Sequence, residues 1–336
     1  MTADVKFMKS ALVLARKGIG DVEPNPAVGC IIVKDNKIIG HGYHKKFGGP
    51  HAEINALKSC KKSPAGATMY ITLEPCCHFG KTLPCTDAII KAGIKKVVAA
   101  AKDPTSKVAG KGFKILKKAG IEIKTDICKN QAQILNAPFF KFAKTKIPWV
   151  IIKWAQSKDG FLARTDKKLW ITNAKSRKDV HKLRKKIQAI LVGINTVLED
   201  DPMLTARPNI GKQPLRIVLD SRLKIPADCN LLKTAKKMPV YIFTIVSKKI
   251  KVKGVETIKV GKYKNSVNLK AVLAELGKRN IQQLLVEGGE KVITSFLKQK
   301  LADEIIVYTS NEKLAKNGKV KTSQIMKKTI IALKKL

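Results

Sequence analysis

The sequence predicts an α/β protein of two domains. The chain has 336 residues, which is enough to form two hydrophobic cores. Segments with helical spacing alternate with short β-rich runs along nearly the whole length, and such alternation is typical of sheets covered by helices. A Lys-rich stretch that ends at Pro148 interrupts the pattern. We therefore expect one domain over residues 1–145 and a second over residues 146–336.

The elements of the first domain follow from local spacing and turn residues. Residues 4–17 interleave charged and apolar side chains, as an amphipathic helix does. Two β-rich runs, 28–33 and 37–42, flank the polar pair Asp35-Asn36 and predict a hairpin. The elements expected after it are a helix at 51–61, a strand at 67–73, a helix at 86–92, a strand at 95–101, and helices at 112–118 and 130–144. This order implies a sheet between layers of helices.

The second domain repeats the alternation after the boundary at residues 144–148. The apolar run 149–155 predicts a strand at its start. The elements expected after this strand are helices at 173–186, 268–278 and 291–297, and strands at 189–193, 215–220, 240–244, 282–287 and 304–308. This alternation again predicts an α/β sheet.

Composition excludes several classes of protein. Apolar residues make up 44% of the chain, but no apolar run is long enough to cross a bilayer. The first residues interleave charges with apolar side chains, which a signal peptide does not. The seven cysteines are an odd number, and three of them lie within residues 76–85. We therefore expect no membrane partner and no disulfide framework, and a reducing cytoplasmic location.

The net charge of +42 has two explanations. A nucleic-acid partner is one of them. However, the 67 basic residues comprise 59 Lys and only 8 Arg, spread over both halves, and aromatic residues are only 5%. Proteins that recognise nucleic acids depend on Arg for bidentate contacts to phosphates and base edges. Composition bias is therefore favoured over specific nucleic-acid binding, and a basic surface would still attract a phosphorylated small substrate.

The most informative motif joins His51-Ala52-Glu53 to Pro75-Cys76 and Cys85. One imidazole and two thiolates suit a catalytic zinc ion, which keeps its fourth position for water. A nearby carboxylate can carry the proton of that water to a leaving amine. The pattern is that of zinc-dependent nucleobase deaminases, in which the Glu is the acid/base and not a ligand. We predict that His51, Cys76 and Cys85 bind Zn²⁺ and that Glu53 is catalytic.

The spacing of the two cysteines leaves their neighbours as alternatives. Generic deaminases of this type have two residues between the cysteines, whereas eight residues separate Cys76 from Cys85. Cys77 cannot easily share an ion with Cys76, so we interpret it as a packing residue. His78 is a rival ligand or a substrate contact.

Three further segments could bind ligands or could be ordinary turns. In residues 24–29, prolines stiffen a loop from which Asn25 could contact a base. Gly288-Gly289 follows a predicted strand and opens a helix, where backbone N–H groups can bind phosphate. Residues 193–207 are polar and could bind ribose and phosphate or simply cap helices. Composition alone does not decide between ligand binding and an ordinary turn or helix cap in these segments.

Together these residues resemble the bifunctional riboflavin-biosynthesis deaminase/reductase family over nearly the whole chain. The resembling segments are 25–29, 42–44, 51–53 and 74–87 in the first domain, and 157–160, 170–172, 196–207, 220–221 and 286–289 in the second. The separation of Cys76 and Cys85 is characteristic of this family. The resemblance implies a cytidine-deaminase-like three-layer αβα domain, followed by a dihydrofolate-reductase-like α/β domain.

The resemblance also implies two successive reactions and their cofactors. Zinc-dependent deamination of 2,5-diamino-6-(5-phosphoribosylamino)pyrimidin-4-one would precede NADPH-dependent reduction of its ribosyl chain to ribityl. The implied NADPH contacts are Gln156, Trp170, Thr196, Asp200, Ser221, Gly289, Glu290, Lys291, Val292, Ile293, Thr294 and Ser295. The implied substrate contacts are Asn25, Lys168, Arg184, Leu204, Arg207 and Glu287, with the arginines on the phosphate. The resemblance leaves homo-oligomerisation open.

The sequence departs from the family pattern in three places. Lys158 replaces an apolar residue beside the nicotinamide site, the loop 159–170 is short and carries Lys168, and a Lys-rich tail at 311–336 replaces closing strands. A deaminase with an impaired reductase domain is therefore the first alternative. A zinc deaminase acting on RNA would require C-x-x-C and no second domain. A basic RNA-binding protein would not need the intact set of zinc-binding residues.

Overall fold

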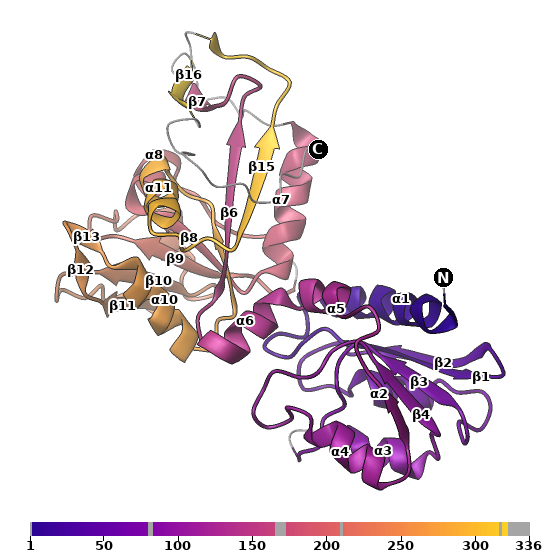
Figure 1. Cartoon of the computed structure of the whole chain (residues 1–336). Coiled ribbons are helices and arrows are strands. Elements are labelled where there is room, and N and C mark those ends of the chain that lie inside the picture. The colour runs from indigo at the N-terminus through magenta and orange to yellow at the C-terminus, as the bar shows by residue number, and fades with distance from the viewer. Residues whose placement is uncertain (1, 80–82, 165–172, 209–210, 316–317, 322–336) are drawn as a thin grey trace. The chain divides into compact units, whose positions relative to one another are not determined.

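The chain forms two compact units, Met1–Lys146 and Ile147–Leu336. The computed structural model describes residues 2–79, 83–164, 173–208, 211–315 and 318–321 (Figure 1). Among these residues, no helix is long and apolar enough to cross a membrane. The two units are described separately.

The first unit contains one sheet and a helical layer on each of its faces (Figure 1). Its elements are α1 (Ala3–Ala15), η1 (Arg16–Gly18), β1 (Gly29–Lys34), β2 (Lys37–Tyr43), α2 (Ala52–Lys58), β3 (Thr68–Ile71), α3 (Cys85–Lys91), β4 (Lys96–Ala99), α4 (Lys111–Lys118), β5 (Glu122–Lys124), α5 (Lys129–Leu135) and α6 (Ala137–Thr145). The strand order is β2-β1-β3-β4-β5.

Two separate apolar cores define the three layers of this unit. On one face, Ala56 of α2, Ile89 of α3 and Leu116 of α4 pack with the sheet. On the other face, α1 packs through side chains such as Met8, and α5 through Ala132. Burial on both faces explains why β1, β3 and β4 are apolar runs. The predicted αβα class is confirmed.

The predicted hairpin is confirmed, but one predicted helix is wrong. β1 and β2 pair antiparallel, and both turn residues, Asp35 and Asn36, have the positive φ of a hairpin turn. The helix expected over 130–144 is instead two helices, which break at Asn136. The Asn136 side chain accepts a hydrogen bond from Ala27 N–H (2.8 Å) and donates one to Ala27 C=O (2.9 Å). This tertiary contact decides the break, so helical periodicity could not predict it.

The second unit is built on a seven-stranded sheet. Its elements are β6 (Trp149–Gln156), β7 (Phe161–Arg164), α7 (Ala174–Lys186), β8 (Ala189–Gly193), α8 (Ile194–Asp200), β9 (Leu215–Leu219), α9 (Asn230–Lys233), β10 (Val240–Thr244), β11 (Val255–Lys259), β12 (Lys262–Tyr263), β13 (Ser266–Val267), α10 (Leu269–Lys278), β14 (Gln283–Val286), α11 (Glu290–Lys298), β15 (Glu304–Thr309) and β16 (Gly318–Lys321).

The large sheet has the order β11-β10-β9-β8-β14-β6-β15, and every adjacent pair in it is parallel. α10 and α11 pack on one face, and α7, α8 and α9 on the other. The carboxyl ends of parallel strands meet at one edge, where ligands of open α/β sheets bind. The tail that we expected to lack closing strands contributes β16, which pairs with β7.

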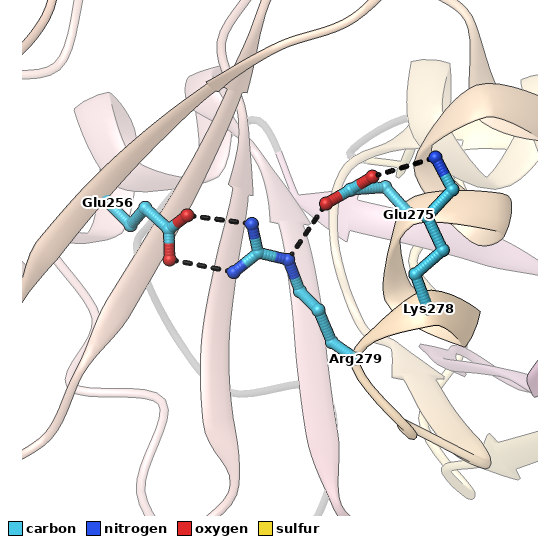
Figure 2. A network of polar contacts seen from close by, with 4 residues as sticks. All are labelled: Glu256, Glu275, Lys278 and Arg279. Carbon is cyan, nitrogen blue, oxygen red and sulfur yellow. Dashed lines mark hydrogen bonds and ion pairs between the residues drawn. The ribbon is translucent and has the colours of Figure 1, made fainter.

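Figure 2 shows how the edge strand β11, which periodicity did not predict, is tied to the end of α10. Arg279 donates to both carboxylate oxygens of Glu256 on β11 (2.8 and 2.7 Å) and to Glu275 on α10 (3.0 Å). Its guanidinium also lies 4.8 Å from the centre of the Tyr241 ring. Lys278 pairs with the same Glu275 at 3.6 Å. These contacts connect β11, β10 and α10.

Candidate functional site

Three potential metal ligands converge at the carboxyl end of β3. His51 is the N-cap of α2, Cys85 is the first residue of α3, and Cys76 lies in the segment between β3 and α3. Their ligand atoms all lie within 4.8 Å of one another, and His51 Nδ1 is 3.4 Å from each sulfur. Within the described residues, this is the one group of three such side chains that could hold a metal. One nitrogen and two sulfurs form a donor set that suits zinc.

The two thiols have opposite tendencies to ionise. Hydrogen bonds from Cys85 and from His51 lower the pKa of Cys76 to about 4. The hydrogen bond to Cys76, together with burial, raises the pKa of Cys85. The two cysteines therefore share one proton. A divalent cation bound by the three side chains would displace this proton, because a cysteine binds metal as the thiolate and not as the thiol. Cys77 and His78 do not belong to the converging group.

Glu53 lies in the first turn of α2 and is 3% exposed. Burial, and then the charge of Cys76, raise the pKa of this carboxyl to about 7. A carboxyl group with a pKa close to neutrality can both accept and release a proton. The position of Glu53 beside the converging ligands thus suits a general acid/base.

A cavity of about 350 Å³ opens onto these residues. Asn25, His78 and Asp103 line it together with His51 and Glu53. The cavity therefore brings the predicted contact Asn25 and the alternative ligand His78 to the same place as the metal-ligating group.

His44 orients Asn25, a relation that sequence reasoning did not foresee. His44 Nδ1 lies 3.0 Å from the Pro50 carbonyl oxygen, and His44 Nε2 lies 3.2 Å from Asn25 Nδ2. Burial lowers the pKa of His44, so its ring is neutral. Because a carbonyl can only accept, Nδ1 carries the proton and Nε2 accepts from the Asn25 amide. The motif 42–44 was the only sequence signal for this contact.

In the second unit, Arg184 and Glu287 form a buried bidentate pair. Arg184 Nε and Nη2 donate to the two carboxylate oxygens of Glu287 at 2.9 and 2.7 Å, and Nη1 donates to the Thr205 carbonyl at 3.0 Å. Burial raises the pKa of Glu287, but the hydrogen bonds from Arg184 and the charge of Lys153 outweigh it, so the pKa is lowered. Two residues predicted to bind substrate, 103 positions apart, thus meet.

Lys153 on β6 is a residue that sequence reasoning missed. Burial lowers the pKa of its ammonium group, whereas the charge of Glu287 raises it. Its Nζ also lies 5.5 Å from the centre of the Tyr308 ring. The only sequence signal was a lysine in the middle of a β-rich run. The rest of that run is apolar and is typical of a buried structural strand, so it does not indicate a functional residue.

The residues predicted to bind NADPH follow the carboxyl ends of several strands. Gln156 ends β6 and donates to Thr309 Oγ1 (3.3 Å), and Ser221 lies just after β9. Gly289 has a φ of +35° at the start of α11, and a Cβ placed there would be 3.5 Å from Thr196 Oγ1. The parallel sheet therefore brings residues from distant segments to one edge.

The remaining predicted contacts lie in several different settings. Leu204 is 3% exposed, whereas Arg207 and Asp200 are exposed. Residues Glu290, Lys291, Val292, Ile293, Thr294 and Ser295 form the first turns of α11. Trp170 and Lys168 lie outside the described residues. The Lys158 side chain is exposed.

Comparison with known families finds a match for each half of the chain. Residues 1–101 match the cytidine and deoxycytidylate deaminase zinc-binding region. Residues 148–324 match the RibD C-terminal domain. The two matches together cover most of both units.

Curated relatives extend over nearly the whole chain. The riboflavin biosynthesis protein RibD of Aquifex aeolicus is 45% identical over 311 residues, which cover 91% of this chain and 86% of that protein. RibD of Escherichia coli is 37% identical over 340 residues, with 94% and 90% covered.

Solved structures agree with these relatives. An Acinetobacter baumannii RibD structure matches with a TM-score of 0.84 and 39% identity, covering 94% of this chain and 89% of that chain. A diaminohydroxyphosphoribosylaminopyrimidine deaminase/5-amino-6-(5-phosphoribosylamino)uracil reductase from Thermotoga maritima also matches with a TM-score of 0.84. Its identity is 37%, and the match covers 93% of this chain and 88% of that chain.

Proposed function

This chain belongs to the RibD family of riboflavin-biosynthesis proteins, and we propose that it performs two successive reactions on one phosphoribosylaminopyrimidine. The family resemblance, the two fold types and the pairing of a zinc deaminase with an NADPH-dependent reductase, all predicted from sequence, are confirmed by the comparisons. The observation that carries the proposal is the convergence of His51, Cys76 and Cys85 beside the buried Glu53, next to a cavity that His51, Glu53 and Cys76 line.

The first reaction is the deamination of 2,5-diamino-6-(5-phosphoribosylamino)pyrimidin-4-one. His51, Cys76 and Cys85 would hold the zinc ion, which supplies a Lewis acid beside the carbon that loses ammonia. Glu53 takes a proton from the attacking water and delivers it to the departing amine. Its raised pKa and burial suit both transfers. Asn25, held by His44, presents its amide to the pyrimidine edge.

The second reaction is the reduction of the ribosyl chain to ribityl. NADPH supplies the hydride, and Gln156, Thr196, Asp200, Ser221 and residues 289–295 would bind it, together with Trp170. Gly289, which has a positive φ, lies at the start of α11 near the Thr196 hydroxyl, a position that fits the binding of a phosphate-bearing cofactor. Arg184, Leu204, Arg207, Glu287 and Lys168 would bind the substrate. The proposed deaminase domain is 1–145, and the proposed reductase domain is 146–336.

We infer a cytoplasmic protein whose partner is a small phosphorylated molecule, with neither a specific nucleic acid nor a membrane as partner. Lysine is spread along both halves of the sequence rather than gathered with arginine in one stretch, which supports composition bias as the source of the charge. A homo-oligomer is compatible with these inferences.

The proposal is tested by following both reactions in one sample. Zinc-loaded full-length protein is given the diaminopyrimidine substrate and NADPH, and ammonia release and NADPH oxidation are recorded together. We expect equal amounts of ammonia and oxidised NADPH. Ammonia without NADPH oxidation would refute the proposed second reaction, and the absence of both would refute the proposal as a whole.

A further inference from the structure

The buried side chain of Glu74 has no role in the proposed chemistry. Glu74 lies between β3 and the Pro75-Cys76 corner and is 4% exposed. It is not one of the converging metal ligands. A buried carboxylate is costly unless it is hydrogen-bonded, so its partners indicate what it does.

Within the described residues, the Glu74 carboxylate accepts hydrogen bonds from three backbone N–H groups, all of them in one segment. Oε2 accepts from Asp103 N (3.2 Å) and from Gly110 N (2.9 Å), and Oε1 accepts from Phe113 N (3.4 Å). One oxygen therefore holds both ends of the 103–110 loop. The other oxygen reaches the first turn of α4.

Glu74 also completes the start of α4 from a distance. The N-cap of α4 is Gly110, which has no side chain to accept from the first N–H groups. A carboxylate at this end is favoured by the helix dipole and by the free N–H groups. The first turn packs directly on the metal-ligating corner, since a Cβ at Gly112 would clash with the Pro75 carbonyl oxygen.

The loop that Glu74 closes forms one wall of the cavity. Asp103, Thr105, Lys107 and Val108 all line it. Within the loop, the Asp103 carboxylate accepts from Thr105 N (2.7 Å) and from Thr105 Oγ1 (2.5 Å). The position of this wall relative to Cys76 is thus set by a side chain two residues before that cysteine.

We propose that Glu74 is a positioning residue for the deamination. Its carboxylate closes the 103–110 loop and seats it against the Pro75-Cys76 corner, so that the substrate-facing wall and a metal ligand share one anchor. This inference rests on the proposed deaminase activity of the same cavity. Since the loop lines the cavity and provides none of the converging metal ligands, loss of the anchor should weaken substrate binding more than it slows the chemical step.

The test compares Glu74→Gln with wild type in the full-length, zinc-loaded protein. The amide keeps the shape of the carboxylate but turns an N–H₂ group toward backbone N–H donors. We expect the zinc content to be unchanged and KM for the diaminopyrimidine substrate to rise about 10- to 100-fold, as expected for the loss of charge-assisted hydrogen bonds. We expect kcat to change less than KM. Glu74→Asp, which keeps the charge, should recover part of the loss.

Two further measurements keep the outcomes distinct. Glu122→Gln is the matched control, because the Glu122 side chain is 61% exposed and its one ion pair among the described residues is with Lys96. The KM of this variant should be that of wild type. Amide hydrogen exchange at residues 103 and 110 should be faster in Glu74→Gln, and this readout does not need catalysis. If wild type releases no ammonia, the proposed function fails while the exchange result still decides the role of Glu74.

The proposal is overturned if KM and the exchange rates of Glu74→Gln equal those of wild type. It is also overturned if the variant loses zinc and kcat falls at unchanged KM, because Glu74 would then act through the metal ligands. If Glu74→Gln does not fold, Glu74→Asp is measured alone. An intermediate KM with faster exchange at residues 103 and 110 supports the proposal, and wild-type values overturn it.

Discussion

The substitution Glu287→Gln provides a sharp test of the polar cluster in the second unit. It removes the negative charge that acts on two partly buried cations, Arg184 and Lys153. Arg184 donates two hydrogen bonds to this carboxylate, and its side chain is 17% exposed, compared with 6% for Glu287. Lys153 is the second cation. The variant would leave the largely buried Arg184 without the carboxylate that it binds, and would remove the charge of Glu287 from Lys153.

The expected loss of stability follows from this burial. Removing one partner of a buried ion pair costs about 3–5 kcal/mol in the free energy of unfolding, because the other charge stays buried. For a unit of this size, that corresponds to a fall of roughly 6–20 °C in Tm. The exposed control Glu199→Gln on α8 should change the free energy of unfolding by less than about 0.5 kcal/mol.

Tryptophan fluorescence during urea unfolding measures this effect selectively. The chain has three tryptophans, Trp149, Trp154 and Trp170, and all of them follow residue 146. The fluorescence transition therefore reports on the second unit alone. Its midpoint and slope give the free energy of unfolding.

The effect should also depend on pH in a defined direction. The folded-state pKa of Glu287 lies below the ordinary value of 4.5. Its stabilising contribution is therefore complete well above pH 4.5 and is lost as the pH falls through the folded-state pKa. The difference between wild type and Glu287→Gln should be full at pH 7 and should shrink below pH 4.5. A difference of less than about 1 kcal/mol at pH 7, or one that grows in acid, would refute this reasoning.

Four further outcomes can be checked independently. Glu53→Gln should keep its zinc by metal analysis but lose at least about 100-fold in the rate of ammonia release, since no group then carries the proton; near-normal turnover would contradict the assigned role. Cys85→Ser should lose most of the zinc and Cys77→Ser should keep it, and the reverse result would show that the ligand assignment is wrong. Asn136→Leu leaves both backbone groups of the buried Ala27 without their partner, so the first unit should lose about 3 kcal/mol by thermal unfolding; a stability equal to that of wild type would show that this clamp is unimportant. Arg279→Gln should lower the free energy of unfolding of the second unit by only about 1 kcal/mol, because Glu256 and Glu275 are partly exposed. A loss several times larger would show that these ion pairs contribute more than partly exposed pairs do.

Local patterns predicted most of the regular elements of both units. The hairpin at Asp35-Asn36 and the strands at 189–193 and 240–244 lie where the sequence placed them. Their signals are local: apolar runs for buried strands, and residues that tolerate positive φ for the turn. The break at Asn136 and the edge strand β11 were not predictable in this way, because side chains from distant segments stabilise them.

The sequence by itself was enough to predict the chemistry proposed for the first site. His51, Glu53, Cys76 and Cys85 could be identified from residue type and spacing, because a zinc-binding set and its acid/base have few alternatives. Only the tertiary structure decided how these groups are held. The anchoring of the cavity wall by Glu74 and the meeting of Arg184 with Glu287 join segments 29–39 and 103 residues apart. No local or periodic pattern of residues predicts contacts of this kind, because they depend on how strands and helices are brought together in the folded chain.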